Sequence, residues 1–292
     1  MKTPIIKNIM VTLSRKIFFF CLSMAFTAFI ACSNEAEDAS PNLSPDERET
    51  ASSESQHDYY FNDADELAME AFVSEDAQAT GGKVTTDIRL SGAVVVRAGT
   101  FSNGSLKIDF GAGCTDAGGN VRKGLIILEH VGRWKEAGAQ WTITFSGYSI
   151  NGIAIEGTRK VTVTNVTDIS ITHDVELFDG KITWPDGTVA TRTCHFIRKQ
   201  EYNGSQLLSR LIVNGDAQGT SRIGKSFTVK IQEELVYDRS CFDAGVFIAV
   251  QGKKLIKHGD LELTIDYGDG SCDNTVTLTN KAGVTIQYEV SK

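Results

Sequence analysis

Four cysteines in the body of the chain have the clearest chemistry: Cys114, Cys194, Cys241 and Cys272. An even number of cysteines suits disulfide bonds in a protein that is exported to an oxidising compartment. Proximity in the sequence favours pairing of Cys241 with Cys272, which leaves Cys114 to pair with Cys194. Free, buried thiols that pack as small apolar side chains are the alternative.

No metal-binding or nucleophilic motif accompanies these cysteines. There is no C-x-x-C pair and the histidines are scattered, so we expect no metal site and no cofactor. Cys194 is next to His195, but neighbouring residues of a strand point to opposite faces, which keeps a nucleophile from its base. The G-x-S-x-G and H-E-x-x-H motifs do not occur. The sequence therefore predicts a protein that is not an enzyme; a hydrolase built from distant carboxylates is an alternative.

Acidic and amide side chains crowd two glycine-rich segments. They are Asp109, Asp116 and Asn120 in the first segment and Asp266, Asp269, Asp273 and Asn274 in the second. Calcium takes oxygen ligands from such loops. Tight turns use the same residue types for backbone reasons, and no EF-hand spacing is met, so turn formation is the favoured interpretation.

Three tryptophans could stack on sugar rings if they were exposed. Trp141 alternates with polar residues in a strand-like run, which favours a place in the core. Trp184 precedes Pro185-Asp186-Gly187 at an expected hairpin tip and is therefore the candidate ligand contact. Packing of Trp184 against its own turn is the favoured interpretation.

The elements that must carry these residues are β-strands. Apolar and polar residues alternate with a period of two over 141–146, 161–164 and 227–232. Asn-Gly or Asp-Gly dipeptides, which favour tight hairpin turns, begin at positions 103, 151, 179, 186, 203, 214 and 269. We expect an all-β fold of antiparallel, hairpin-rich sheets over residues 81–292, either as one large domain or as two related β-modules dividing near 165–200.

A short internal echo is relevant to the choice between these two arrangements. Ile108-Asp109-Phe110-Gly111 is followed by Cys114, and Ile265-Asp266-Tyr267-Gly268 is followed by Cys272. Each copy follows a strand-like run and enters a glycine-rich turn. The echo predicts either two related modules or two equivalent hairpins of one sheet.

The segment before residue 81 has a different composition. Residues 33–80 contain 14 acidic residues and one basic residue. Such a segment buries too little apolar surface to offset its chain entropy, so we expect an acidic disordered tether over 32–61. Apolar residues at helical spacing then predict a short helix over about 63–76, within a helix-and-linker segment that covers 62–80.

The folded part carries almost no net charge. The whole chain has a formal charge of −8, whereas residues 81–292 contain 24 basic and 23 acidic residues. A nucleic-acid-binding surface needs a concentration of basic residues. We therefore expect no nucleic-acid partner.

The N-terminus has the features of an export signal. Basic residues precede an apolar run, 17–30, that is too short to span a bilayer. The run ends in Phe29-Ile30-Ala31-Cys32, which resembles the lipobox of bacterial lipoproteins. The resemblance implies a signal peptide over 1–31, cleavage between Ala31 and Cys32, and acylation of Cys32 as the membrane anchor.

The resemblance extends further along the chain. Glu35, Glu37 and Asp38 look like the surface-export signal of Bacteroidota lipoproteins. The strings IDFGAGCTDAGGNVRKGLIIL, ITFSGYSINGIAIEGTRKVT, GKITWPDGT and DYGDGSCDNTVTLTN resemble an uncharacterised family of those lipoproteins. This family implies an all-β, outer-membrane protein, with the cell surface favoured over the periplasmic face, and implies no activity. We expect a non-catalytic binding or scaffolding module with an envelope protein or a glycan as partner.

Overall fold

The computed structural model describes residues 43–79, 87–203, 208–246 and 248–290. Its helical elements are α1 (Pro45–Ala79), the 3-10 helix η1 (Ile88–Leu90) and α2 (Arg239–Asp243). Its strands are β1 (Val94–Gly99), β2 (Asn103–Asp109), β3 (Cys114–Thr115), β4 (Val121–Val131), β5 (Gln140–Ile150), β6 (Ile153–Val166), β7 (Ser170–Thr183), β8 (Val189–Tyr202), β9 (Leu208–Thr220), β10 (Ser226–Asp238), β11 (Gln251–His258), β12 (Leu261–Asp269), β13 (Thr275–Asn280) and β14 (Thr285–Glu289).

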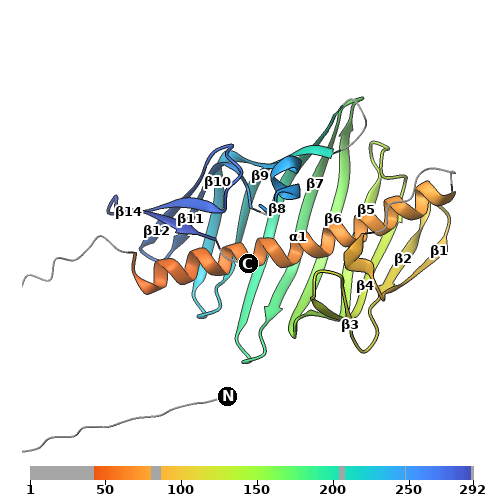
Figure 1. Ribbon diagram of the computed structural model, residues 1–292, viewed down its shortest axis with the longest axis horizontal. Coiled ribbons are helices and arrows are strands. Elements are labelled where there is room, and N and C mark those ends of the chain that lie inside the picture. Colours follow the sequence, from red (N-terminus) through yellow and green to blue (C-terminus); the bar gives the residue numbers. More distant parts are fainter. Residues whose placement is uncertain (1–42, 80–86, 204–207, 247, 291–292) are drawn as a thin grey trace, which may run out of the picture. The chain divides into compact units, whose positions relative to one another are not determined.

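These strands form one antiparallel sheet in which neighbours along the chain are neighbours in space (Figure 1). The order runs from β1 to β14, except that the short β3 pairs only with β4. The expectation of an all-β fold is confirmed, and the single sheet decides in favour of one large domain over two modules. The two copies of the internal echo lie on β2 and β12, near opposite edges of this sheet.

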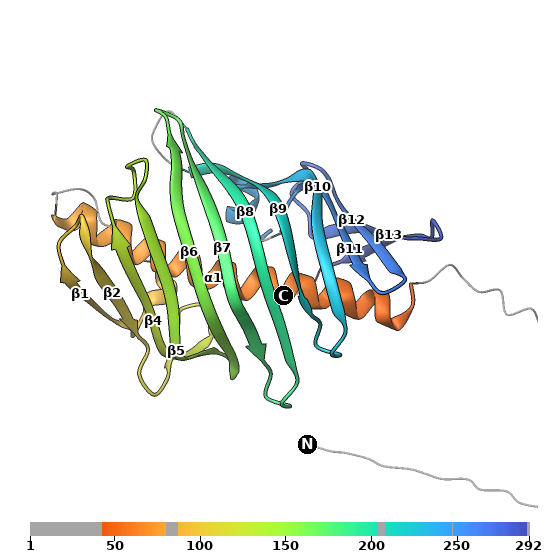
Figure 2. The same cartoon turned by 180° about the vertical axis from the view of Figure 1, so that it is seen from behind.

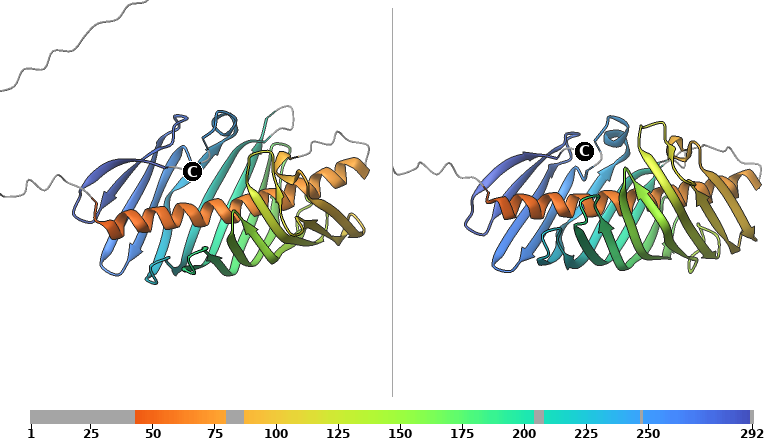
Figure 3. Two further views of the ribbon diagram at one scale, coloured as in Figure 1. Left: turned by 60° about the horizontal axis from the view of Figure 1, so that its bottom comes forward. Right: turned by 90° about the horizontal axis from the view of Figure 1, so that it is seen from below.

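Helix α1 lies across one face of the sheet (Figures 1 and 3). It follows the sheet from the C-terminal strands at its start to the N-terminal strands at its end. None of the helices of the described residues lies on the opposite face of the sheet (Figure 2). We call these the covered face and the open face.

Helix α1 begins at Pro45, although the sequence predicted a helix only from about residue 63. Its start is encoded locally. The Glu47 amide donates a hydrogen bond to the Ser44 hydroxyl, and the Ser44 amide donates one to the Glu47 carboxylate. This reciprocal pair is a capping box, and proline is well suited to the first helical position.

The prediction of a disordered tether is therefore wrong for residues 45–61. Their acidic side chains were taken to be solvated, but several of them form ion pairs with the covered face. Residues 32–42 of the predicted tether lie outside the described residues.

Strand alternation divides each long strand between the two faces. In β7, the apolar residues Ile171, Val175 and Leu177 are buried, as is His173, and the residues that alternate with them are partly exposed. The buried set joins apolar residues of α1 in one core cluster. Period-two alternation is thus the local cause of the sheet's amphipathic character.

Two of the expected hairpin turns are instead irregularities within strands. Asn151 and Gly152 have φ of 51° and 82° and form the turn between β5 and β6, as expected. Asp179, however, lies inside β7 at φ 50°, where the pairing with β8 shifts register. Asn214 lies inside β9. A bulge demands the same positive φ as a tight turn, so the dipeptide alone does not distinguish them.

Candidate functional site

A polar stripe on α1 faces the sheet. Asp46, Thr50, Glu54, Asp58, Asn62 and Asp65 follow one another at intervals of four or three residues. This spacing places them along one side of the helix. Each of them contacts a residue of the sheet or of one of its turns.

Cationic side chains on the covered face of the sheet lie opposite this polar stripe of α1. Arg159 is on β6, Arg192 and Arg198 are on β8, and Lys254 is on β11. Arg192 and Arg198 share the parity of buried Cys194 and Phe196, so strand alternation directs them toward α1. Arg159, Arg192 and Lys254 are buried.

The central cluster consists of Glu54, Asp58, Asp65, Arg159, Arg192, Arg198 and Lys254. Arg192 Nη2 lies 3.0 Å from Glu54 Oε1, and Arg192 Nη1 lies 3.1 Å from Asp58 Oδ1. Lys254 Nζ lies 2.5 Å from Asp58 Oδ2 and 3.2 Å from Glu54 Oε1. These four side chains therefore join α1 to two strands that are not adjacent.

The remaining members of the central cluster continue this network along α1. Arg159 Nε lies 2.5 Å and Arg198 Nη1 lies 3.2 Å from the same oxygen, Asp65 Oδ2. Arg198 Nη2 also donates a hydrogen bond to Oδ1 of the Asn62 side chain at 2.5 Å. One carboxylate thus serves two guanidinium groups.

Burial and ion pairing act in opposite directions on the acids of this cluster. Burial raises the pKa of Glu54, and Arg192 and Lys254 only partly counter it. Burial would also raise the pKa of Asp58, but Lys254 and Arg192 outweigh it and hold that pKa well below the ordinary value. Asp58 is thus the firmly ionised acid of the pair.

A second cluster lies further along α1. Arg122 on β4 donates to Asp63 at 2.5 Å, to Asp116 at 2.9 Å and to the Tyr148 hydroxyl at 2.7 Å. Arg89 reaches the same Asp63 at 3.1 Å. Burial opposes the charge of Arg122, but its hydrogen bond to Asp63 and its other partners raise its pKa. This peripheral cluster fixes the middle of α1 over the first half of the sheet.

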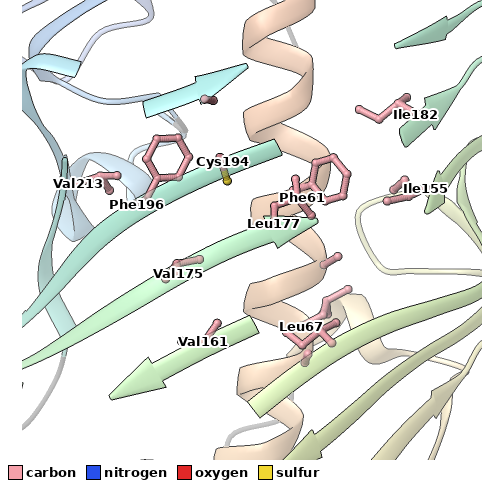
Figure 4. Close-up of a cluster of buried hydrophobic side chains, with 14 of the residues drawn as sticks. Phe61, Leu67, Ile155, Val161, Val175, Leu177, Ile182, Cys194, Phe196 and Val213 are labelled. Carbon is pink, nitrogen blue, oxygen red and sulfur yellow. The ribbon is translucent and has the colours of Figure 1, made fainter. Parts of the chain in front are cut away.

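Apolar contacts complete the docking of α1 (Figure 4). Phe61 and Leu67 lie among buried side chains of the sheet, including Val161, Val175 and Leu177. Further along α1, the centre of the Phe72 ring lies 4.5 Å from the centre of the His130 ring. The covered face is therefore filled by side chains of the protein itself.

Two small cavities lie between α1 and the sheet. One cavity, next to Arg159, Arg192 and Cys194, has a volume of about 10 Å³, and another, next to Val213 and Tyr237, about 20 Å³. A space of roughly 10–15 Å³ is what a single water molecule needs. Neither cavity is large enough for an organic substrate.

The candidate ligand contact, Trp184, is not available to a ligand. Its side chain is only 5% exposed, and the guanidinium carbon of Arg222 lies 4.7 Å from the centre of its ring. The Trp184 amide donates to the Thr188 carbonyl at 3.0 Å, which closes the turn. Trp184 packs against its own hairpin, as the favoured interpretation held.

The exposed aromatic residues do not form a common platform. Among the described residues they are Tyr59 on α1 and Phe178 on β7, which are 46% and 45% exposed. Phe178 follows Leu177, whose side chain is buried on the covered face, so the Phe178 ring lies on the open face. Stacking on a glycan needs rings on one surface, and these two rings lie on opposite sides of the molecule.

The cysteines divide into one pair and two free thiols. Cys241 and Cys272 form a disulfide. The expected bond between Cys114 and Cys194 is absent, because both thiols are free and lie on β3 and β8, far apart in the strand order. Burial raises the pKa of the Cys194 thiol despite the nearby arginines, so Cys194 stays protonated and unreactive.

The clustered acidic residues act as turn formers. Asp109, Asp266 and Asp269 each accept a hydrogen bond from the amide two residues further on. Asp116 accepts from the Gly118 and Asn120 amides and also pairs with Arg122. Over the described residues, no group of three or more histidine, cysteine or acidic side chains is placed to hold a metal ion.

Cys194 and His195 point to opposite faces, as expected from strand geometry. Cys194 is buried under α1, whereas His195 is exposed on the open face and lies 2.8 Å from Asp174. The cleavage and lipidation residues Ala31 and Cys32 lie outside the described residues. Within the described part of the chain, no helix is both long and apolar enough to cross a bilayer.

Sequence reasoning missed both ion-pair clusters. One available signal was the Ser44-Pro45-Asp46-Glu47 capping box, and a second was the regular spacing of the acids after it. A third was a cation at an apolar position of several strands, such as Arg159 of β6 in line with Val161. Comparison with family models, with curated proteins and with solved structures found no match for this chain. The site is therefore interpreted from its own geometry.

Proposed function

We propose that the protein is a lipid-anchored component of the bacterial cell envelope that acts as a non-catalytic binding or scaffolding module. The N-terminal export signal and its lipobox cysteine support the anchor. One observation about the folded part carries the rest of the proposal: α1 fills the covered face with its own side chains. This leaves the open face as the surface on which a partner can bind.

The composition of the open face suits a polar partner. A row of cross-strand neighbours crosses five adjacent strands, from β6 to β10. Its members, in order, are Lys160, Glu176, His195, Asp216 and Lys230. Basic and acidic side chains alternate along this row, and a lysine and a carboxylate that face each other on adjacent strands stabilise one another. Such a surface stays hydrated and soluble, and it favours a protein or another polar envelope component over a lipid or nucleic acid.

The first experiment is protease shaving of intact cells that express the protein with a C-terminal tag. Digestion of the tag on intact cells would place the β-sheet outside the cell, and the screen would then be for surface partners. Survival of the tag until the outer membrane is broken would place the sheet in the periplasm and favour scaffolding there. A Cys32→Ala variant is the control, and its retention in the membrane fraction would contradict the proposed anchor.

A crosslinking experiment tests whether the partner contacts the open face or the side of the protein that carries α1. A photo-crosslinking residue at His195 reports on the open face, and the same residue at Glu66, exposed on α1, is the matched control. We expect discrete adducts from position 195 in cells and none from position 66. Adducts from position 66 alone would overturn the assignment of the open face.

A further inference from the structure

The sheet ends at β1, a strand with one neighbouring strand. Among the described residues β1 pairs with β2 alone, and it lies at the lateral end of the sheet (Figures 1 and 2). An edge strand presents backbone amides and carbonyls that can pair with a further strand. The edge at β1 is therefore a surface on which another chain can continue the sheet.

The hydrogen bonds of the β1–β2 hairpin indicate which backbone groups of β1 face outward. At the turn, the Thr100 amide donates to the Asn103 carbonyl at 2.8 Å. The pairs of an antiparallel ladder alternate between hydrogen-bonded and non-hydrogen-bonded pairs. Along this ladder, Val94 and Val96 bond to β2, whereas the amide and carbonyl of Val95 point away from it. Val95 can therefore form both hydrogen bonds of a pair with another strand.

The open-face side chains of β1 are apolar. Val94 and Val96 are 61% and 53% exposed, and Val95, which alternates with them, packs against the core. The charged residue of β1, Arg97, is turned toward α1, and its guanidinium carbon lies 5.7 Å from the centre of the Phe72 ring. Proteins usually protect an edge strand from association with charged side chains or proline. The open face of β1 carries neither, so this edge is suited to association.

The other edge strand, β14, has the opposite character. Its open-face residues Thr285, Gln287 and Glu289 are polar and exposed. Pairing β1 of one copy with β14 of another would take Glu289 out of water beside valines, without a partner of opposite charge. Such head-to-tail pairing would also leave a free edge at each end and so form an open chain of copies. Pairing of β1 with β1 avoids both costs and closes the assembly.

We propose that two copies of the protein form a symmetric dimer in which their β1 strands pair antiparallel, with the two-fold axis at Val95. The two Val95 residues then exchange both backbone hydrogen bonds, and Val94 of each copy faces Val96 of the other. Such β-branched pairs stabilise a sheet. The two-fold axis is perpendicular to the sheet, so the two open faces form one continuous surface and both copies of α1 lie on the other side. The dimer does not depend on what the open face binds.

Cysteine crosslinking of the full chain in cells tests the pairing and its register. All variants carry Cys114→Ala, which removes the partly exposed free thiol. In Val94→Cys/Val96→Cys, each new thiol lies opposite one of the other copy, with Cβ atoms about 5 Å apart. We expect a covalent dimer of twice the monomer mass that reductant dissociates. Val94→Cys alone should stay largely monomeric, because its thiol then faces a valine, and equal crosslinking of this single variant would overturn the register.

The matched control is Thr285→Cys/Gln287→Cys, which places two thiols at the same spacing on the open face of β14. This control should stay monomeric. Equal crosslinking of the two double variants would overturn the proposal, as would a Val94→Cys/Val96→Cys variant that gives no covalent dimer.

Analytical ultracentrifugation of the full chain, purified in detergent, gives a second measurement. The wild-type protein should have twice the monomer mass. Val95→Pro removes the outward amide that the pair needs and should shift the mass to that of the monomer. Should Val95→Pro fail to fold, Val94→Lys/Val96→Lys replaces it, because it sets like charges against each other across the interface. A monomeric wild-type protein, or a variant that stays dimeric, would contradict the proposal.

Discussion

Arg192 on β8 and Glu54 on α1 form an ion pair of 3.0 Å across a separation of 138 residues, and each side chain is only 2% exposed. Such a pair gains its stability from mutual compensation, so the loss of one partner leaves the other charged and buried. The relationship between α1 and the sheet can therefore be tested at this single contact.

Replacing Arg192 with methionine should lower the free energy of unfolding by about 3–5 kcal/mol, because Glu54 and Asp58 are then left with Lys254 alone. Urea denaturation followed by circular dichroism measures this loss. Lys181→Met breaks an exposed pair with Glu156 and should cost less than about 1 kcal/mol. Equal losses in the two variants would contradict the importance of the buried pair.

Stability should fall as the pH is lowered from 6.5 toward 4. Burial, reinforced by Arg192, lowers the pKa of His57 to about 4. Between pH 6.5 and pH 4, His57 is protonated in the unfolded chain but stays neutral in the folded protein. Lowering the pH therefore favours the unfolded state. The full contribution of His57 is about 3 kcal/mol, present above pH 6.5 and lost by pH 4.

The His57→Asn variant isolates this contribution. Its side-chain amide can still donate to the Ser53 carbonyl, which His57 Nδ1 contacts at 2.8 Å. His173, whose pKa burial also lowers to about 4, remains in both proteins, as do the acids of the central cluster. Urea denaturation at several pH values should therefore give a shallower pH dependence for the variant. Parallel curves would argue against the assignment to His57.

Loss of the Cys241–Cys272 disulfide should destabilise the protein. The bond closes a loop of 31 residues, for which chain entropy gives about 3–4 kcal/mol. The double variant Cys241→Ala/Cys272→Ala should show this loss and should no longer respond to reductant. Cys114→Ala is the control, and its Tm should fall on reduction as the wild-type Tm does.

Gly219 on β9 tolerates no side chain. A Cβ added there would lie 1.9 Å from the Thr191 carbonyl oxygen, which is backbone and cannot move aside. We expect Gly219→Ala to cost about 3 kcal/mol. Gly224→Ala, at φ +76° with open space around it, should cost only about 1 kcal/mol. A reversed order in chemical denaturation would show that β8 and β9 can separate more easily than their register implies.

The strands could be predicted because the relevant information is local. Alternation such as that of Trp141, Ile143 and Phe145 with polar residues fixes which side chains share a face, whatever the partner strand is. Turn residues such as Asn151-Gly152 then separate one strand from the next. The number of sheets was left open, since period two specifies a face and not a neighbour.

The first half of α1 was misread because its acids have no partners nearby in the sequence. Composition alone makes 45–61 look like a solvated tether. Glu54 and Asp58 are stable in a buried position only because Arg192 and Lys254 reach them from β8 and β11. Even so, the capping box was a local signal from which the start of α1 could have been predicted.

The sequence by itself determined the β-strands and the near-neutral charge of residues 81–292, because each depends on a contiguous pattern. The export signal and the lipidation of Cys32 stay predictions from the same kind of pattern. Only the tertiary structure decided that one sheet forms, that Cys114 and Cys194 stay apart, and that α1 lies across the covered face. The docking of α1 depends on contacts between residues more than a hundred positions apart, such as Glu54 and Arg192. A buried charge is stable only when its oppositely charged partner is also in place. Because the two partners belong to distant segments, the sequence of either segment alone cannot predict the contact.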